Sequence, residues 1–180
     1  NYAAALEVAK LIFHIQPWLE NYQEIRELAT QLGRWETLRS ELLTFLQTSQ
    51  QTYTLTEVAL DEGEIDKALE LLKAARVSNQ SHGRTYNYDS RYYTIAIKVA
   101  NAAVESYPHA AIEIYQPYIE HLISQRGRSN YEAACSYLAK VRALYEKLGE
   151  SEEWTNYIAS VRKQNSRLVS FKQELAAAGL

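Results

Sequence analysis

Apolar residues recur along most of this chain with the three- and four-residue spacing of amphipathic helices. The longest such stripe occupies residues 131, 134, 135, 138, 141, 145 and 148. Gly149 follows it, at the place where many helices end in a left-handed residue. A second stripe with the same spacing comes next and consists of Trp154, Tyr157, Ile158 and Val161. Residues 130–158 therefore predict a helical hairpin whose second helix is capped by Ser151.

The same order of stripe, glycine and stripe occurs earlier in the chain. Gly33 and Gly63 are 30 residues apart, and two positions later Trp35 or Ile65 opens the next stripe. A period near thirty of helix–turn–helix units is typical of α-solenoids of the tetratricopeptide (TPR) type. Such hairpins bury their apolar faces against stacked neighbours. We therefore predict an all-α fold of about nine helices, in which antiparallel helical hairpins stack as a short TPR-like right-handed α-solenoid.

Prolines and capping residues mark the expected ends of several helices. Pro17 and Pro108 suit the first turn of a helix, where the missing N–H costs nothing. Pro117 falls inside an apolar stripe and predicts a kink or a split in that helix. Two pairs of residues have capping-box spacing, namely Thr54 with Glu57 and Ser129 with Glu132.

The first helix is expected over residues 2–14. Leu6, Ala9 and Phe13 lie on one side of it, and Val8 and Ile12 extend that side into a wide apolar face. A later helix, over residues 91–107, is apolar nearly all round and should therefore be a central helix.

A polar interruption at residues 78–90 separates two groups of stripes. We expect a single helical-repeat domain over residues 1–180, with sub-units 1–79 and 90–180. Tyrosines and arginines gather at the interruption: Arg84, Tyr86, Tyr88, Arg91 and Tyr92. Rings and guanidinium groups together can stack on a peptide or on bases and can bind a carboxylate. The alternative is that the rings pack over the edge of the hydrophobic core where two helical units meet. Arg126 and Arg128, in one turn, form a second candidate basic patch.

Charge and cysteine content narrow the class of protein. The formal net charge is -3, so no global basic field attracts nucleic acid. Residues 1–75 carry 6 basic and 12 acidic side chains, whereas residues 121–180 carry 9 and 6. This asymmetry reflects either solvated helix faces or a mild basic surface for an acidic partner. The single cysteine, Cys135, excludes an internal disulfide and fits a reducing compartment, so we expect a cytoplasmic protein without membrane spans or a signal peptide.

No pattern of reactive side chains points to catalysis. The four histidines lack metal-ligand spacing, and no phosphate loop, nucleophile elbow or dinucleotide fingerprint occurs. The acidic turn at residues 61–64 is expected to be solvated, because it lacks the alternating ligands of a calcium loop. We therefore expect no catalytic residues, no metal and no cofactor.

Residues 112–180 contain a QRGR turn, Trp154 and a terminal ELAAAGL among regularly spaced apolar positions. This segment resembles the C-terminal helical region of bacterial proteins with a SWIM-type zinc finger. In that family the zinc finger lies upstream and has a Cys-x-Cys pair and a Cys-x-His pair. This sequence has neither pair, so no zinc-ligand role passes to Cys135. The resemblance implies a setting of nucleic-acid or protein interaction.

Two functions follow as hypotheses. The first is a non-catalytic helical-repeat scaffold that binds a protein or peptide partner on its concave face, with tyrosines and arginines as anchors. The second is an accessory helical region of a nucleic-acid-associated SWIM zinc finger protein, whose zinc finger lies outside this chain and whose basic residues touch phosphates. A structural role, holding a domain N-terminal to these residues, is also open.

Overall fold

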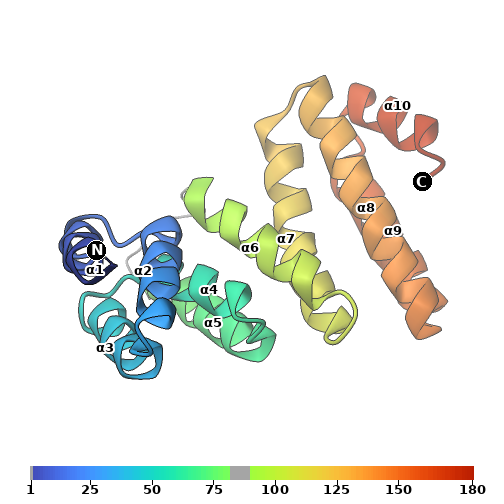
Figure 1. The fold of residues 1–180 in the computed structure, drawn as a ribbon. Helices are drawn as coiled ribbons and strands as arrows, with labels where there is room; N and C mark the ends of the chain where they lie inside the picture. Colours follow the sequence, from blue (N-terminus) through green and yellow to red (C-terminus); the bar gives the residue numbers. More distant parts are fainter. Residues whose placement is uncertain (1, 82–89) are drawn as a thin grey trace. The chain divides into compact units, whose positions relative to one another are not determined.

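Every element of the computed structural model, which describes residues 2–81 and 90–180, is an α-helix. In chain order (Figure 1) the helices are α1 (Tyr2–Ile15), α2 (Leu19–Gln31), α3 (Trp35–Thr48), α4 (Thr52–Asp61), α5 (Ile65–Ser81), α6 (Ser90–Ala103), α7 (Pro108–Gln125), α8 (Arg128–Leu148), α9 (Ser151–Gln164) and α10 (Val169–Ala177). The all-α prediction is confirmed. The described residues form ten helices where about nine were expected.

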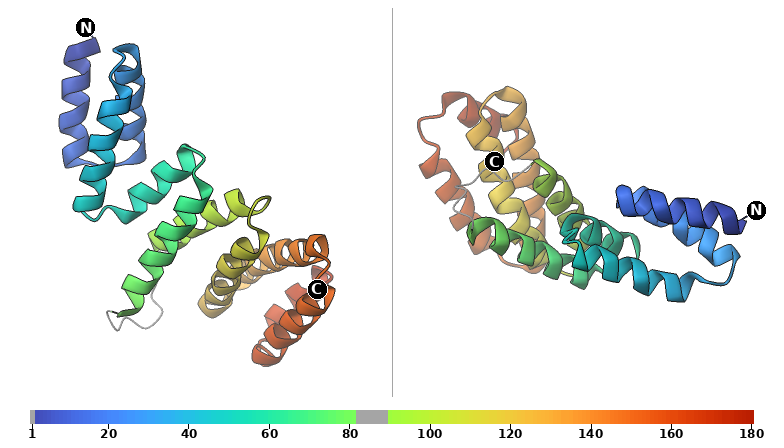
Figure 2. Two further views of the ribbon diagram at one scale, coloured as in Figure 1. Left: turned by 90° about the horizontal axis from the view of Figure 1, so that it is seen from below. Right: turned by 90° about the vertical axis from the view of Figure 1, so that its left-hand side faces the viewer.

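The chain divides into two compact units, residues 1–95 and residues 96–180. Their boundary lies inside α6, whereas residues 78–81, expected to break the pattern, continue α5. Within each unit, chain neighbours pack as hairpins, including α1 with α2, α4 with α5 and α7 with α8. Figure 2 shows the first of these hairpins, with α1 running alongside α2.

The predicted glycine turns are present. Gly33, Gly63 and Gly149 have φ values of +65°, +75° and +73°, a conformation that L-residues with side chains rarely adopt. At the end of α8, the Gly149 N–H donates to the Glu146 carbonyl at 3.1 Å and the next N–H donates to the Tyr145 carbonyl at 2.9 Å. These bonds satisfy carbonyl groups that the helix itself leaves without a donor.

The three predicted side-chain caps are wrong. The N-cap residues of α4, α8 and α9 are Gln51, Gly127 and Glu150, and none of these helices has a side-chain cap hydrogen bond. α4 begins two residues before Thr54, α8 begins one residue before Ser129 and α9 begins at Ser151 itself, so all three expected caps are already helical. A capping residue needs an extended backbone, which a residue inside a helix does not have.

The prolines have three different outcomes. Pro108 occupies the first turn of α7, as predicted. Pro17 lies two residues before α2 begins at Leu19, so it is outside that helix. Pro117 lies inside α7, which continues through it to Gln125, so this proline does not split the helix.

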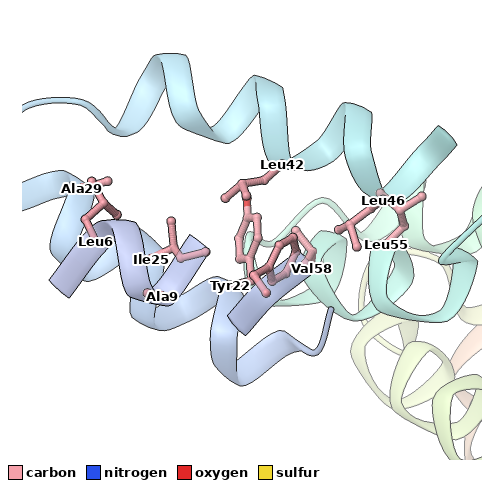
Figure 3. Close-up of a cluster of buried hydrophobic side chains, with 10 residues drawn as sticks. Leu6, Ala9, Tyr22, Ile25, Ala29, Leu42, Leu46, Leu55 and Val58 are labelled. Carbon is pink, nitrogen blue, oxygen red and sulfur yellow. The ribbon is translucent and has the colours of Figure 1, made fainter. Parts of the chain in front are cut away.

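The core of the first unit joins α1, α2, α3 and α4 (Figure 3). The figure shows Tyr22 of α2 lying between the helices, with Leu42 of α3 beyond its hydroxyl end. The buried side chains are Leu6, Ala9, Phe13, Tyr22, Ile25, Ala29, Leu42, Leu46, Leu55 and Val58. The wide apolar face predicted for α1 is buried only in part, because Val8 and Ile12 remain exposed.

The second unit is built around α8, which packs against α7, α9 and α10. Five members of the predicted stripe are buried: Tyr131, Ala134, Cys135, Leu138 and Val141. Beyond Val141 the buried position is Leu144, while Tyr145 and Leu148 are half-buried. The buried positions shift because an α-helix has 3.6 residues per turn, so residues seven apart do not point in the same direction and the difference accumulates along this long helix. α10 closes the other end of α8, where the rings of Tyr131 and Phe171 lie 5.4 Å apart.

Ion pairs hold the turn between α4 and α5, so the prediction of a solvated turn is correct only in part: Asp61 and Gly63 are exposed, but the carboxylates of the turn are paired. Arg39 of α3 donates to Glu62 through Nε at 3.0 and 3.1 Å and to Glu64 at 2.9 Å. The Tyr22 hydroxyl donates to Glu62 at 2.7 Å, and Arg26 of α2 binds Asp61 at 2.6 Å. We call this group of side chains, Tyr22, Arg26 and Arg39 with Asp61, Glu62 and Glu64, the polar clamp. The first unit therefore combines an apolar core with a polar clamp on this turn.

Burial and hydrogen bonding act in opposite directions on Glu62. Burial by itself would raise the pKa of this carboxyl, but the bonds from Arg39 and Tyr22 outweigh it and the pKa is lowered. Burial and the same carboxylate raise the pKa of Tyr22. The clamp is therefore ionised at Glu62 and protonated at Tyr22 at neutral pH.

None of the helices in the described ranges is both long and apolar enough to cross a membrane.

Candidate functional site

The residues predicted at the polar interruption fall into two groups. Arg84, Tyr86 and Tyr88 lie outside the described residues, so their roles stay predictions. Arg91 and Tyr92 lie in the first turn of α6. The Arg91 guanidinium carbon is 5.4 Å from the centroid of the Tyr53 ring, a cation–π distance.

Tyr92 is a core side chain. It is 7% exposed, and its ring lies edge-on to that of Tyr93 with 5.6 Å between centroids. This burial favours the alternative reading, in which rings close the edge of a core. Tyr92 offers a partner little surface to touch.

The basic turn between α7 and α8 is partly neutralised. Arg128 Nε lies 3.1 Å from Glu132 and 3.2 Å from Glu174 of α10. Arg126 ends α7 with a φ of 56°, and its carbonyl accepts a hydrogen bond from Asn130 at 2.6 Å. The predicted patch therefore keeps the charge of Arg126, while Arg128 serves to join α8 to α10.

A different group of side chains lies together on α6, α7 and α8. On α7, Tyr115, Tyr118 and His121 are spaced by three residues, and on α8 Tyr137 and Lys140 have the same spacing. Side chains three apart share a helix face, and α7 packs along α8, so the two rows meet. Asn101 of α6 completes the group. We call these six residues the aromatic–lysine cluster.

The buried end of the cluster is fixed by Tyr115. Its side chain is fully buried, and its hydroxyl donates to Asn101 Oδ1 at 2.7 Å. Lys140 Nζ lies 3.4 Å from the same oxygen, 4.8 Å from the Tyr137 ring centroid and 5.8 Å from that of Tyr115. Two aromatic faces and one amide oxygen thus hold the ammonium group of an otherwise exposed lysine.

The open end of the cluster consists of half-buried rings. Tyr118 meets Tyr137 edge-on at 5.0 Å between centroids. On its other side Tyr118 stacks with His121 at 6.4 Å and an interplanar angle of 20°. These contacts place the three rings in a continuous row that is partly open to solvent.

Burial sets the protonation of these groups. It raises the pKa of Tyr115 and of Tyr137, with a further contribution from a neighbouring tyrosine in each case. It lowers the pKa of His121. At neutral pH Tyr115 and Tyr137 therefore keep their phenolic protons and His121 is neutral, while Lys140 supplies a cation. The cluster can offer aromatic faces, hydroxyl donors and one cation to a ligand.

Sequence reasoning missed this cluster because it treated the residues separately. Tyr115 and Tyr118 have the spacing of apolar residues on one helix face, and tyrosines are denser at residues 86–93. The available signal was the spacing of Tyr118 to His121 and of Tyr137 to Lys140, each joining an aromatic ring to a polar group on one helix face.

Within the described ranges, no group of three or more His, Cys, Asp and Glu side chains could hold a metal ion. Cys135 is buried, and burial together with Glu174 raises the pKa of its thiol to about 11. A buried thiol with a raised pKa is a poor nucleophile.

Comparison with known proteins yields one partial similarity. No family model matches the chain. A stretch of 68 residues, 38% of the chain, is 36% identical to "Uncharacterized protein YwqB" of Bacillus subtilis (strain 168). That stretch is 13% of the length of the Bacillus protein, so the chain corresponds to a small part of it. No solved structure matches.

Proposed function

We propose that this chain is a non-catalytic helical-repeat scaffold that binds a protein or peptide partner through the aromatic–lysine cluster. The observation that carries the proposal is the position of Lys140, held over the rings of Tyr115 and Tyr137 on one side of a row of half-buried aromatic side chains. Three helices supply the cluster, so its geometry is set by their packing rather than by a loop.

The chemistry of the cluster suits a peptide that places an acidic side chain beside an apolar one. A carboxylate would pair with the Lys140 ammonium in a charge-assisted contact. An apolar or aromatic side chain would pack on Tyr118 and Tyr137, because tyrosine supplies a large contact area with few rotatable bonds. Helical-repeat proteins commonly bind extended partners in this way.

A binding role rather than a catalytic one is supported by the protonation of the cluster. Tyr115 and Tyr137 have raised pKa values, so neither of these phenols is activated as a nucleophile. The single, buried Cys135 suits a reducing compartment, and we therefore place the scaffold in the cytoplasm.

Selection from a random dodecapeptide phage library tests the proposal. We expect the wild-type chain to enrich peptides with Asp or Glu next to an aromatic or aliphatic residue. A selected peptide should bind Lys140→Met at least about tenfold more weakly, because one charge-assisted contact contributes about 1.5–3 kcal/mol. Lys140→Arg should retain binding, since a guanidinium group also pairs with carboxylates and lies over aromatic rings.

Two matched variants control for general effects. Lys172→Met removes an exposed lysine of α10, and Tyr107→Ala removes an exposed tyrosine that is no member of the cluster. Both should bind the selected peptide as the wild type does. Failure to enrich any peptide, or equal binding by Lys140→Met, would reject the cluster as the site.

A second candidate function rests on a separate group of basic residues. Arg162, Lys163, Arg167 and Lys172, at the end of α9 and the start of α10, are exposed, and no carboxylate of the described residues pairs with them. They would suit the accessory role in a nucleic-acid-associated SWIM zinc finger protein. This role predicts weak binding of a fluorescent single-stranded oligonucleotide that falls steeply with salt. An unchanged fluorescence anisotropy at low salt would exclude it.

A further inference from the structure

The first helix carries a second apolar face that the first unit leaves open. Val8, Leu11 and Ile15 are 56%, 68% and 79% exposed. Together with exposed Ala4, they occupy positions 4, 8, 11 and 15 of α1. Alternating steps of four and three residues form the seam of a coiled coil.

This seam lies on the side of α1 opposite the core. Leu6, Ala9 and Phe13 are buried on the other side, facing α2 and α3. With Ile12 at its edge, the open face exposes roughly 400 Å² of apolar surface, at on the order of 100 Å² for each large, half-exposed side chain. A patch of that size lies within the range of the largest apolar patches on monomeric proteins, which are often functional.

We infer that α1 pairs in antiparallel orientation with α1 of a second copy of this chain. An antiparallel seam sets position 4 against position 15 and position 8 against position 11. Small Ala4 then faces Ile15 of the partner subunit, and Val8 faces Leu11 of the partner subunit. Each layer occurs twice, as the two-fold symmetry of a dimer requires. The seam is therefore complementary in volume to itself.

The charges beside the seam favour the same orientation. Glu7 and His14 flank it on one edge, and the edge on the other side is apolar at Ala5 and Ile12. Antiparallel pairing brings Glu7 next to His14 of the partner subunit, twice by symmetry, and brings the two apolar edges together. Parallel pairing would instead set Glu7, which pairs with Lys10 of its own helix, against Ile12 of the partner subunit and bury charge beside an apolar side chain.

The area agrees with a reversible dimer. Two such faces bury about 800 Å² in total, which is the size of a weak or transient interface between proteins. α1 is already a folded helix held by α2, so pairing orders few side chains. We therefore expect a dimer that dissociates at micromolar concentration.

Sedimentation equilibrium of the 180-residue chain tests the dimer. The apparent mass should rise from 20.6 kDa toward twice that value between about 1 and about 500 µM. Leu11→Glu should stay at the monomer mass throughout. Ala3→Glu, an exposed change of equal charge on the same helix but away from the seam, should dimerise as the wild type does. Both variants should melt like the wild type, because neither residue is buried.

Cysteine cross-linking tests the orientation. Antiparallel pairing places two copies of residue 4 eleven residues apart along the axis, or about 16 Å, and sets residue 4 opposite residue 15. A mixture of Ala4→Cys and Ile15→Cys should therefore form a disulfide-linked dimer, while either variant alone should not. A chain that stays monomeric at the highest concentration, a Leu11→Glu variant that still dimerises, or efficient cross-linking of Ala4→Cys alone would overturn the proposal. So would a monomer whose α1 face binds only a helix of different sequence.

Discussion

Arg39 binds both carboxylate oxygens of Glu62, which lies 23 positions further along the chain. The pair joins the middle of α3 to the turn that connects α4 and α5. The Tyr22 hydroxyl joins α2 to the same carboxylate. Because the Glu62 side chain is 12% exposed, this contact is screened by water far less than a surface ion pair.

Glu62→Gln should destabilise the protein by about 2 kcal/mol, because the bonds of a charged acceptor to Arg39 and Tyr22 are lost or weakened. Urea unfolding followed by circular dichroism measures the change. Glu146→Gln provides the matched control, since it removes an exposed pair with Arg142 and should cost less than about 0.5 kcal/mol. Equal costs for the two variants would show that the clamp contributes no more than a surface pair.

Stability should also fall at acidic pH through the same carboxylate. The pKa of Glu62 is lower in the folded protein than its ordinary value of 4.5, so the unfolded chain binds the proton more readily. The contribution is complete above about pH 4.5 and is lost as the pH falls through the folded value. The free energy of unfolding, measured from pH 7 down to about pH 3, should decrease over that range. Glu62→Gln should show a shallower decrease, and an identical profile would contradict the assignment.

Two tyrosine hydroxyls should respond in opposite ways to removal. The Tyr157 hydroxyl is buried without a hydrogen-bond partner in the described structure, and burial raises the pKa of that phenol. Tyr157→Phe should be neutral or stabilising by up to about 1 kcal/mol, because no bond is lost. Tyr115→Phe removes the bond to Asn101 and should cost about 1 kcal/mol. Thermal unfolding of both variants measures the difference, and a destabilised Tyr157→Phe would indicate a partner such as buried water.

Two leucines of α1 lie on different faces of the helix and should respond differently to replacement by Ala. Leu6 is buried against the core, and its replacement by Ala should cost about 2–5 kcal/mol. Leu11 is exposed in the monomer, so Leu11→Ala should change monomer stability by less than about 0.5 kcal/mol. Dilute samples, at which the proposed dimer dissociates, give the relevant comparison. A large cost for Leu11→Ala under those conditions would mean that the open face is covered within the chain.

Cys135 should react slowly with thiol reagents in the folded protein. It is 4% exposed, and the raised pKa of its thiol, about 11, leaves little thiolate at neutral pH. The reaction with Ellman's reagent should accelerate at least about a hundredfold in denaturant, where the pKa returns toward about 8.5 and access is free. Rapid reaction under native conditions would contradict the burial of α8 on this side.

The spacing of apolar residues was enough to predict the helices and their hairpin turns. Gly33, Gly63 and Gly149 could be assigned from sequence because a helix that ends in a left-handed residue favours glycine for local steric reasons. Helix starts were less predictable. Thr54, Ser129 and Ser151 have capping side chains, but each lies inside a helix, since tertiary packing outweighs a preference of about 1 kcal/mol.

What the sequence by itself determined is therefore local: the all-α class, the hairpin turns and the buried stripe of α8. Only the tertiary structure decided which polar groups meet. Glu62 with Arg39, and Lys140 with Tyr115 and Asn101, come from helices distant in sequence, and no periodicity encodes such pairings. It also decided which apolar face of α1 is covered, because hydrophobic spacing marks a face as apolar without specifying whether a neighbour packs on it.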